Sequence, residues 1–508
     1  MNKIYKIIWS DARKCYVVVA EIAKNRGKNN VRTIVEGLSA HALVRAGRWA
    51  LPFVAAGALL LPVSAWATTI TPKSGVTNNV FNTKTGVYDV YAQEITTDNA
   101  FGVSRFQSFS LDNGHIANMY FKLQNDPANV NTLVNLVQNR IDVKGTVNAI
   151  KSGKIDGNLF FISPNGMTLG PSGVINAGSF TALAPTSDYF DKLWGETNVL
   201  ADQLDKDLKN FGKRDDKGEF KKTTDLEFNS DAEKGIKIEG KINTRSGILL
   251  GAGDIVIAQG AVLKALKSTD SQNGINFNEL VNTSAASAGL SGDLNAVTDK
   301  DGDIIIRAQS VSEFTKTPIS SQIYDTIRNS SNSARAEVAG QILSDGMVDV
   351  SANAQSTFDH TTWNLIDKFF NPTDISQNLF NKLGFNCTAD WASKKNTASV
   401  TVTKDGNIRA GGNASLQADA GVSVVIRSAT IGKKEAGTST AIPVTSIAVA
   451  DVENKAVVDV AGAVNSVRGD VSLAANAKAK VDILAKAETV PPDDFERPAV
   501  PAPLPAKC

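Results

Sequence analysis

A short phrase recurs along this chain: a glycine, a turn-forming residue, and then apolar side chains at alternate positions. Its copies begin at Gly157, Gly253, Gly302, Gly346, Gly412 and Gly469. A period of two places the apolar side chains on one face of an extended strand, and glycine suits the turn that precedes it. The phrase therefore predicts short, half-buried strands that are separated by turns.

The side chains expected to point inward are mostly aliphatic: Leu159/Phe161, Ile255/Ile257, Ile304/Ile306, Val348/Val350, Ala414/Leu416 and Val471/Leu473. Such strands could build a sandwich, a barrel or a solenoid. Small inward residues, Gly/Asn/Asp-rich turns and a constant phrase orientation favour the solenoid. We expect an all-β fold, a right-handed parallel β-helix with about 12 to 15 coils of roughly 20 to 25 residues.

The spacing of the phrase is uneven, so we expect insertions that leave the rod. Residues 186–234 are charged, and Leu193, Leu200, Leu204, Leu208 and Phe211 share one helical face. The predicted helical insertion at 186–234 separates the segment that begins the rod from a stretch of β-helix at 235–356. A further stretch of β-helix is expected at 396–487, and a Pro-rich tail at 488–508 ends the chain. A linker in that position suggests a longer parent protein or a truncated reading frame.

The second expected insertion, residues 357–395, is rich in aromatic side chains. Trp363, Ile366 and Phe370 suit one short helix, and Ile375, Leu379 and Leu383 suit another. Its rings are Phe358, Trp363, Phe369, Phe370, Phe380, Phe385 and Trp391. They could form a patch that contacts a receptor, but packing of the helices against the rod is the favoured explanation.

The N-terminus reads as an export signal. An apolar run over 49–67 follows Arg45 and Arg48 and ends in Ala65-Trp66-Ala67, a pattern that signal peptidase accepts, so we expect cleavage between Ala67 and Thr68. A membrane-spanning helix is the alternative, but two prolines interrupt the run, and its apolar core is shorter than the roughly 20 residues that a bilayer needs.

Charge and cysteine content agree with export. Residues 1–67 carry a net charge of +7, and the remaining residues carry −6. The net charge of the whole chain is therefore +1, which does not indicate the basic face that binds nucleic acid, so we expect no nucleic-acid partner. Only Cys387 and Cys508 remain after signal cleavage. Stability is therefore expected from packing and backbone pairing rather than from a disulfide framework, and a Cys387–Cys508 bond is left open.

The first 28 residues resemble the extended signal-peptide region of very large bacterial type V secreted proteins. Asn2, Lys3, Tyr5 and Trp9 carry the likeness, together with the valines and glutamate at 17–21. An amphipathic helix of a cytosolic domain is the alternative. The resemblance implies a diderm bacterium, passage through Sec and the outer membrane, and a secreted or surface-bound product.

Residues 101–186 are similar to the secretion domain of two-partner-secretion exoproteins, the filamentous haemagglutinin-like family, and most similar to leukotoxin-type filamentous adhesins. The family's Asn-Pro-Asn-Gly-Ile motif stands here as Ser163, Pro164, Asn165, Gly166 and Met167, with its Pro-Asn-Gly turn intact. The resemblance implies that residues 68–185 cap the β-helix and are recognised by an outer-membrane transporter through its periplasmic domains. The receptor that the rod meets is not implied.

Catalytic chemistry finds little support in the sequence. No paired metal-ligand spacing lies near His115 or His360, and Asp254, Asp303 and Asp470 each follow a turn glycine singly, as loop caps do. We therefore expect a non-enzymatic adhesin without cofactor or metal. A β-helical polysaccharide lyase and the stalk of a larger toxin, of the leukotoxin or contact-dependent inhibition type, are the alternatives.

Overall fold

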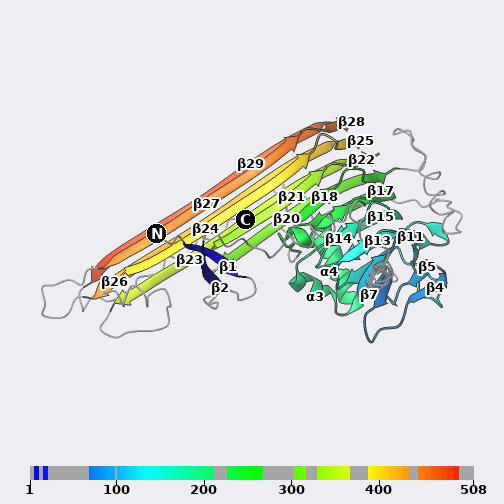
Figure 1. Ribbon diagram of the computed structural model, residues 1–508, viewed down its shortest axis with the longest axis horizontal. Coiled ribbons are helices and arrows are strands. Elements are labelled where there is room, and N and C mark those ends of the chain that lie inside the picture. The colour runs from blue at the N-terminus through cyan, green and yellow to red at the C-terminus, as the bar shows by residue number, and fades with distance from the viewer. Residues whose placement is uncertain are drawn as a thin grey trace, which may run out of the picture. The chain divides into compact units, whose positions relative to one another are not determined.

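The computed structural model describes residues 5–10, 15–20, 68–97, 100–210, 226–266, 302–315, 329–366, 387–433 and 444–490 (Figure 1). The chain divides into two units, Met1–Trp66 and Ala67–Cys508. In the first unit, β1 (Tyr5–Ser10) and β2 (Cys15–Ala20) pair as an antiparallel hairpin, with Trp9 opposite Tyr16.

The second unit is a parallel β-solenoid, so the predicted all-β parallel β-helix is confirmed. Its strands pair in parallel with strands one coil away, in three rows that we call A, B and C. Row A holds β10 (Ile141–Val143), β14 (Met167–Leu169), β16 (Ile236–Ile238), β18 (Asp254–Ile257), β21 (Asn329–Val338), β24 (Cys387–Val402) and β27 (Thr445–Val460).

Rows B and C complete each coil. Row B holds β5 (Val87–Tyr91), β8 (Ile116–Tyr120), β11 (Thr146–Lys151), the first parts of β15 (Val174–Leu183) and β17 (Lys241–Ala252), β19 (Val262–Ala265), β22 (Gln341–Ser344), β25 (Asn407–Ala410) and β28 (Ala463–Ser466). Row C holds β7 (Phe101–Leu111), β9 (Thr132–Val137), β13 (Asn158–Ile162), the second parts of β15 and β17, β20 (Asp303–Thr315), β23 (Val348–Ile366), β26 (Ala414–Lys433) and β29 (Val471–Val490).

The described part of the rod has fewer coils than the sequence predicts. Row C contains nine strands in sequence, which at a spacing of about 4.8 Å span roughly 40 Å. The difference arises because the later coils use strands of up to 20 residues, so each consumes far more chain than a 20- to 25-residue coil. Five of the six glycine phrases form the start of a strand in row C, whereas the phrase at Gly253 forms the start of a strand in row A.

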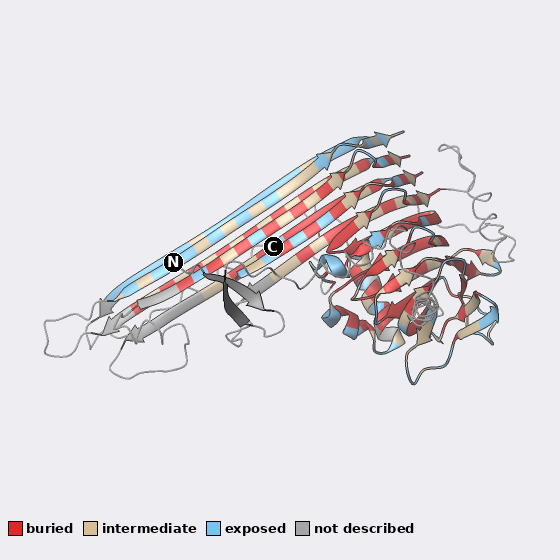
Figure 2. Ribbon diagram, viewed as in Figure 1, coloured by how far each residue is buried: buried red, intermediate tan, exposed pale blue. Residues whose placement is uncertain are grey.

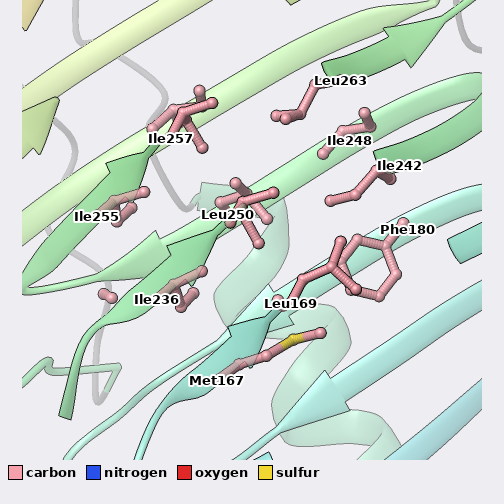
Figure 3. Packing of buried hydrophobic residues seen from close by; sticks show 14 of the residues in the cluster. Met167, Leu169, Phe180, Ile236, Ile242, Ile248, Leu250, Ile255, Ile257 and Leu263 are labelled. Carbon is pink, nitrogen blue, oxygen red and sulfur yellow. The ribbon is translucent and has the colours of Figure 1, made fainter. Parts of the chain in front are cut away.

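The core is one continuous stack of mostly aliphatic side chains (Figures 2 and 3). Met167, Ile236 and Ile255 occupy the same position in three consecutive coils. The predicted inward side chains from Leu159 to Leu416 are at most 1 % exposed, whereas Val471 and Leu473 are 45 % and 56 % exposed. The last two lie in β29, which pairs on one side only among the described residues.

Antiparallel strands cover the first coil. β3 (Thr69–Pro72) and β6 (Glu94–Ile95) pair with β7, and β4 (Val80–Lys84) pairs with β5, each in antiparallel register. A small hairpin strand, β12 (Lys154–Ile155), pairs with β11. Because a free parallel edge invites pairing with another chain, the antiparallel strands act as a cap on this end of the solenoid.

Helices lie in the charged insertion. These are α3 (Ser187–Leu193), α4 (Thr197–Asn210) and the 3₁₀ helix η1 (Ala232–Lys234). Leu193, Leu200 and Leu204, which the sequence places on one helical face, are buried together against Val134 and Ile162 of the early coils. Phe211 lies outside the described residues. The helices therefore shield the outer apolar face of row C.

The predicted aromatic helical insertion at 357–395 is wrong where the chain is described. β23 continues as a strand to Ile366 and β24 begins at Cys387, so Trp363 and Trp391 lie in strands. The reason is non-local: all 19 residues of β23 pair in register with β26. A helical spacing of apolar residues cannot compete with so long a ladder. Residues 367–386, with Phe369, Phe370, Phe380 and Phe385, lie outside the described residues.

The long strands form a two-layered extension of the coil that we call the blade. One layer consists of β20, β23, β26 and β29, and the other of β21, β24 and β27 (Figure 1). Phe358, Val424 and Ala392 pack between the layers. The Phe358 side chain is fully buried, as expected for an aromatic ring that packs against the rod. The Trp391 side chain, in contrast, is 40 % exposed.

A buried ladder of asparagines runs along row B. Asn118, Asn148, Asn176 and Asn243 occupy matching positions, and the Nδ2 of each later asparagine donates to the Oδ1 of the one before it, at 2.9 to 3.3 Å. Asn118 in turn donates to Asp89 at 3.0 Å. All donors point the same way, and the ladder ends on a carboxylate, which only accepts hydrogen bonds.

Removing one rung of this ladder should destabilise the solenoid. We expect Asn148→Ala to lower the free energy of unfolding by about 2 to 4 kcal/mol, since it leaves Asn118 Oδ1 and Asn176 Nδ2 buried without their partner. Urea unfolding of the purified protein measures the change. Asn407→Ala is the control, because Asn407 is exposed in β25 and should change stability little. Equal losses in both variants would refute the role of the ladder.

Candidate functional site

The candidate export motif forms the turn between β13 and β14. The backbone N–H of Gly166 donates to the carbonyl of Ser163 at 3.2 Å, which closes a four-residue turn with Pro164 at its second position. Of the motif residues, only Gly166 has a positive φ, at 78°. Asn165 takes part in the turn without a positive φ.

Gly166 is required by crowding as well as by its backbone angle. A Cβ built on it would lie 2.2 Å from the carbonyl oxygen of Gly235 and 2.4 Å from that of Lys234. Both oxygens belong to backbone of the following coil, so a larger residue cannot be accommodated by turning a side chain. The turn is thus pressed directly against the next layer of the solenoid.

The side chains of the motif are used inside the stack. Ser163 is fully buried; its hydroxyl donates to the carbonyl of Asn139 at 2.9 Å and accepts from the N–H of Asn165 at 3.1 Å. Asn165 is partly exposed, and its Nδ2 donates to the carbonyl of Gln138 at 2.7 Å. Met167 is buried in row A. The motif is therefore a joint between coils, and Asn165 is its most accessible side chain.

Arg140 fastens this turn to both neighbouring coils. Its guanidinium donates to the carbonyls of Asn165 at 2.9 Å, Met167 at 3.3 Å and Gly235 at 3.2 Å. It also contacts the carbonyl of Glu233 and the hydroxyl of Thr168. Burial lowers the pKa of Arg140, while Asp142 and Glu233 oppose that effect.

Sequence analysis missed Arg140, because its partners are backbone carbonyls in other coils. One feature of the sequence could have indicated its role. Arg140 directly precedes the alternating strand Ile141-Asp142-Val143, which pairs with the strand that follows the motif.

A buried arginine joins the helices to the first coils. Arg105 is 3 % exposed and donates to the carbonyls of Trp194 at 3.3 Å and Gly195 at 2.6 Å. It also forms an ion pair with Glu94 at 2.9 Å. Burial raises the pKa of Glu94, but the hydrogen bond to Thr197, the charge and hydrogen bond of Arg105 and the charge of Lys73 together hold it below its ordinary value. Sequence reasoning missed Arg105 too. Arg105 thus holds the end of α3 and the start of α4 against the first coils.

The residues expected at the cleavage site are only partly described. Ala65 and Ala67 lie outside the described residues, as do Asn2 and Lys3, whereas Tyr5 and Trp9 lie in β1. Thr68 is anchored: its hydroxyl accepts from the N–H of Asp112 at 2.9 Å and lies 2.5 Å from His115 Nδ1. The described fold of the second unit therefore begins at the residue that cleavage is predicted to expose.

The polar residues considered for chemistry serve the fold. The Asp254 carboxylate accepts hydrogen bonds from Nε and Nη2 of Arg335 in the next coil, at 2.8 and 3.2 Å. These hydrogen bonds raise the pKa of Arg335. Asp303 accepts from the N–H of Met347 at 2.8 Å. His360 lies 2.5 Å from Asp390 within the blade. Cys508 is outside the described residues, so the structure does not test a Cys387–Cys508 bond, which the sequence leaves open.

The described parts of the chain contain neither a cluster of metal ligands nor a membrane-spanning helix. No group of three or more His, Cys, Asp or Glu side chains there could hold a metal ion. Among the same residues, every helix is too short or too polar to cross a membrane.

Comparison with known proteins identifies the N-terminal segment. Residues 1–50 match the family described as "Extended Signal Peptide of Type V secretion system". This segment is similar to type V signal peptides. The match supports export across the cell envelope to the surface or the medium, and it agrees with the likeness seen at Tyr5 and Trp9.

The other comparisons add less. A solved structure described as "Crystal structure of filamentous hemagglutinin secretion domain" aligns over 80 % of this chain and 99 % of its own, with 11 % identity and a TM-score of 0.25. No curated protein matches the chain. The assignment of the solenoid rests on its strand pairing.

Proposed function

We propose that this chain is an exoprotein of two-partner secretion, whose first coils are bound in the periplasm by an outer-membrane transporter. The observation that carries the proposal is a type V signal-peptide segment, residues 1–50, ahead of a capped β-solenoid that begins at Thr68. A stack of parallel coils suits a chain that crosses a pore unfolded. Each coil that folds outside adds a ladder of backbone hydrogen bonds and draws the next segment outward.

The site of recognition in this proposal is the capped segment 68–185 with its turn at Ser163–Met167. The sequence likeness to haemagglutinin-type secretion domains falls on this segment and on the Pro-Asn-Gly turn. Arg140 and Arg105 support it, because they hold the turn and the helices in fixed positions on the early coils. A transporter would therefore meet a preformed surface whose folding depends on the turn.

The released product, in the same proposal, is a non-enzymatic adhesin of the leukotoxin-type branch that acts at the bacterial surface or in the medium. The long ladders of the blade suit a structural role, and Asp254 and Asp303 have structural partners within the stack. The receptor on a host or bacterial cell stays open.

Binding to the transporter tests the proposal. The mature chain, from Thr68, should bind the purified periplasmic domains of its two-partner-secretion transporter, as measured by biolayer interferometry. Deletion of Ser163–Met167 should abolish this binding and stop secretion while synthesis continues. An equal deletion of residues 213–217, in the charged insertion, should leave both unchanged.

A third variant separates contact from folding. Asn165→Ala removes the most accessible side chain of the turn and its bond to Gln138, but leaves the Arg140 contacts to the backbone. Weaker binding at unchanged stability would identify Asn165 as a contact residue. Absence of binding by the unaltered chain would overturn the proposed function.

A further inference from the structure

Asparagine is followed directly by glycine at Asn113, Asn165 and Asn273. In this dipeptide the backbone nitrogen of glycine can attack the asparagine carboxamide, because glycine has no side chain that hinders the approach. The attack needs an accessible carboxamide and a backbone N–H that no hydrogen bond holds in place. Asn273 lies outside the described residues. The structure therefore compares the reactivity of the other two asparagines.

The first dipeptide is open to this attack. Asn113 and Gly114 are exposed at the tip of the turn between β7 and β8, in which the N–H of His115 donates to the carbonyl of Asp112 at 3.1 Å. Neither the Asn113 carboxamide nor the Gly114 N–H forms a hydrogen bond with the described residues. Apart from its chain neighbours, nothing lies within 4 Å of a Cβ built on Gly114. The turn therefore has room for the ring that the attack forms.

The second dipeptide, in the export motif, is held in place. Asn165 donates through Nδ2 to the carbonyl of Gln138 at 2.7 Å, and the N–H of Gly166 donates to the carbonyl of Ser163 at 3.2 Å. Gly166 is also buried against backbone carbonyls of the next coil. Both hydrogen bonds must break before the Gly166 nitrogen can attack, so the reaction proceeds only from a locally opened state.

We propose that Asn113 is a site of spontaneous deamidation that yields isoaspartate, and that the fold protects Asn165. The Gly114 nitrogen forms a bond to the side-chain carbonyl carbon of Asn113, and the bond from that carbon to Nδ2 breaks. The proton of the Gly114 N–H leaves with the amide group as ammonia. Water then opens the cyclic imide. Opening at the backbone carbonyl of residue 113 leaves the main chain running through the former side chain, and opening at the other carbonyl gives ordinary aspartate.

The turn that carries Asn113 anchors the start of the cap. The N–H of Asp112 donates to the hydroxyl of Thr68 at 2.9 Å, and His115 Nδ1 lies 2.5 Å from the same oxygen. An isoaspartate adds one backbone carbon between Asp112 and His115, which hold Thr68 from the two ends of the turn. The added carbon moves one partner of Thr68 relative to the other. Deamidation therefore loosens the anchor of β3, the strand that follows Thr68.

Peptide mapping of the purified mature chain tests the proposed site. During incubation at pH 8 and 37 °C, mass spectrometry of tryptic peptides should show acid accumulating at residue 113 at least about tenfold faster than at residue 165, since residue 165 reacts only after local opening. Methylation by a protein isoaspartyl methyltransferase identifies the isoaspartate. In urea that unfolds the chain, the two rates should agree to within about threefold. Equal rates in the folded chain, or an intact Asn113 there, would overturn the proposal.

Hydrogen exchange tests the effect on the cap. In the deamidated chain, the backbone amides of residues 69–71 should exchange at least about fivefold faster than in the fresh chain. Asn113→Asp is the matched control, because it carries the new charge without the added backbone carbon. Asn113→Gln, which cyclises far more slowly, should keep the exchange of the fresh chain through the same incubation. Unchanged exchange after deamidation, or an equal increase in Asn113→Asp, would refute the loosening of the cap by the isoaspartate.

Discussion

Gly166→Val should stop secretion of this protein. Valine is strained at a φ of 78°, and its Cβ would lie 2.2 Å from the Gly235 carbonyl oxygen, so the turn must separate from the next coil. Separation would also break the contacts of Arg140 to Asn165, Met167 and Gly235. We expect a loss of at least about 3 kcal/mol in the free energy of unfolding. In cells that make the transporter, the released fraction should fall at least tenfold.

Gly153→Ala is the matched control for this variant. Gly153 has a similar φ of 74°, but nothing lies within 4 Å of a Cβ built on it. It therefore carries the backbone strain without the collision, and secretion should stay within about twofold of the unaltered chain. Immunoblots of medium and cells measure both fractions. Normal release of Gly166→Val would show that contact between the turn and the next coil is dispensable for export.

Lys394→Met should stabilise the protein at neutral pH. The Lys394 side chain is fully buried within the blade; its Nζ donates to Ser330 at 2.8 Å and lies 5.0 Å from the centre of the Phe358 ring. Burial lowers the pKa of Lys394 to about 8. Below that pH the folded protein holds a desolvated charge, which methionine removes. We expect a gain of about 2 to 3 kcal/mol at pH 7.

The pH dependence of this gain distinguishes it from improved packing. Between pH 8 and the unfolded pKa of about 10.5, the unfolded chain binds more protons than the folded chain, so the stability of the unaltered protein rises with pH. The advantage of Lys394→Met should therefore be largest below pH 8 and small above pH 10.5. Urea unfolding at pH 7, 9 and 10.5 measures it, with Lys395→Met as an exposed control. A gain that is constant over this range would contradict the explanation.

The sequence predicted those structural features that depend only on residues a few positions apart. The alternation at Ile236 and Ile238 identifies a strand whose inward face is buried whatever coil follows it. Two other predicted features also depend on near neighbours in the sequence. They are the turn at Pro164-Asn165-Gly166 and the helical face that carries Leu193, Leu200 and Leu204. These features depend on residues a few positions apart, so a single sequence contains the information.

Features that depend on neighbouring coils were not predictable in this way. The strand around Trp363 is held by pairing with residues 426–432, more than sixty positions away, and its local spacing suggested a helix. Arg140 and Lys394 resemble surface residues in the sequence, and only stacking of the coils buries Lys394 and partly covers Arg140. The described coils are fewer than the sequence predicts for the same reason, since the length of the blade strands is fixed by pairing between coils.

Release of the chain with and without its transporter tests the proposed function most directly. In a diderm host that makes both proteins, the chain should appear in the medium or on the cell surface, with its new N-terminus at Thr68. Without the transporter it should stay in the periplasm in equal total amount. Equal release under the two conditions would contradict export of this solenoid by two-partner secretion.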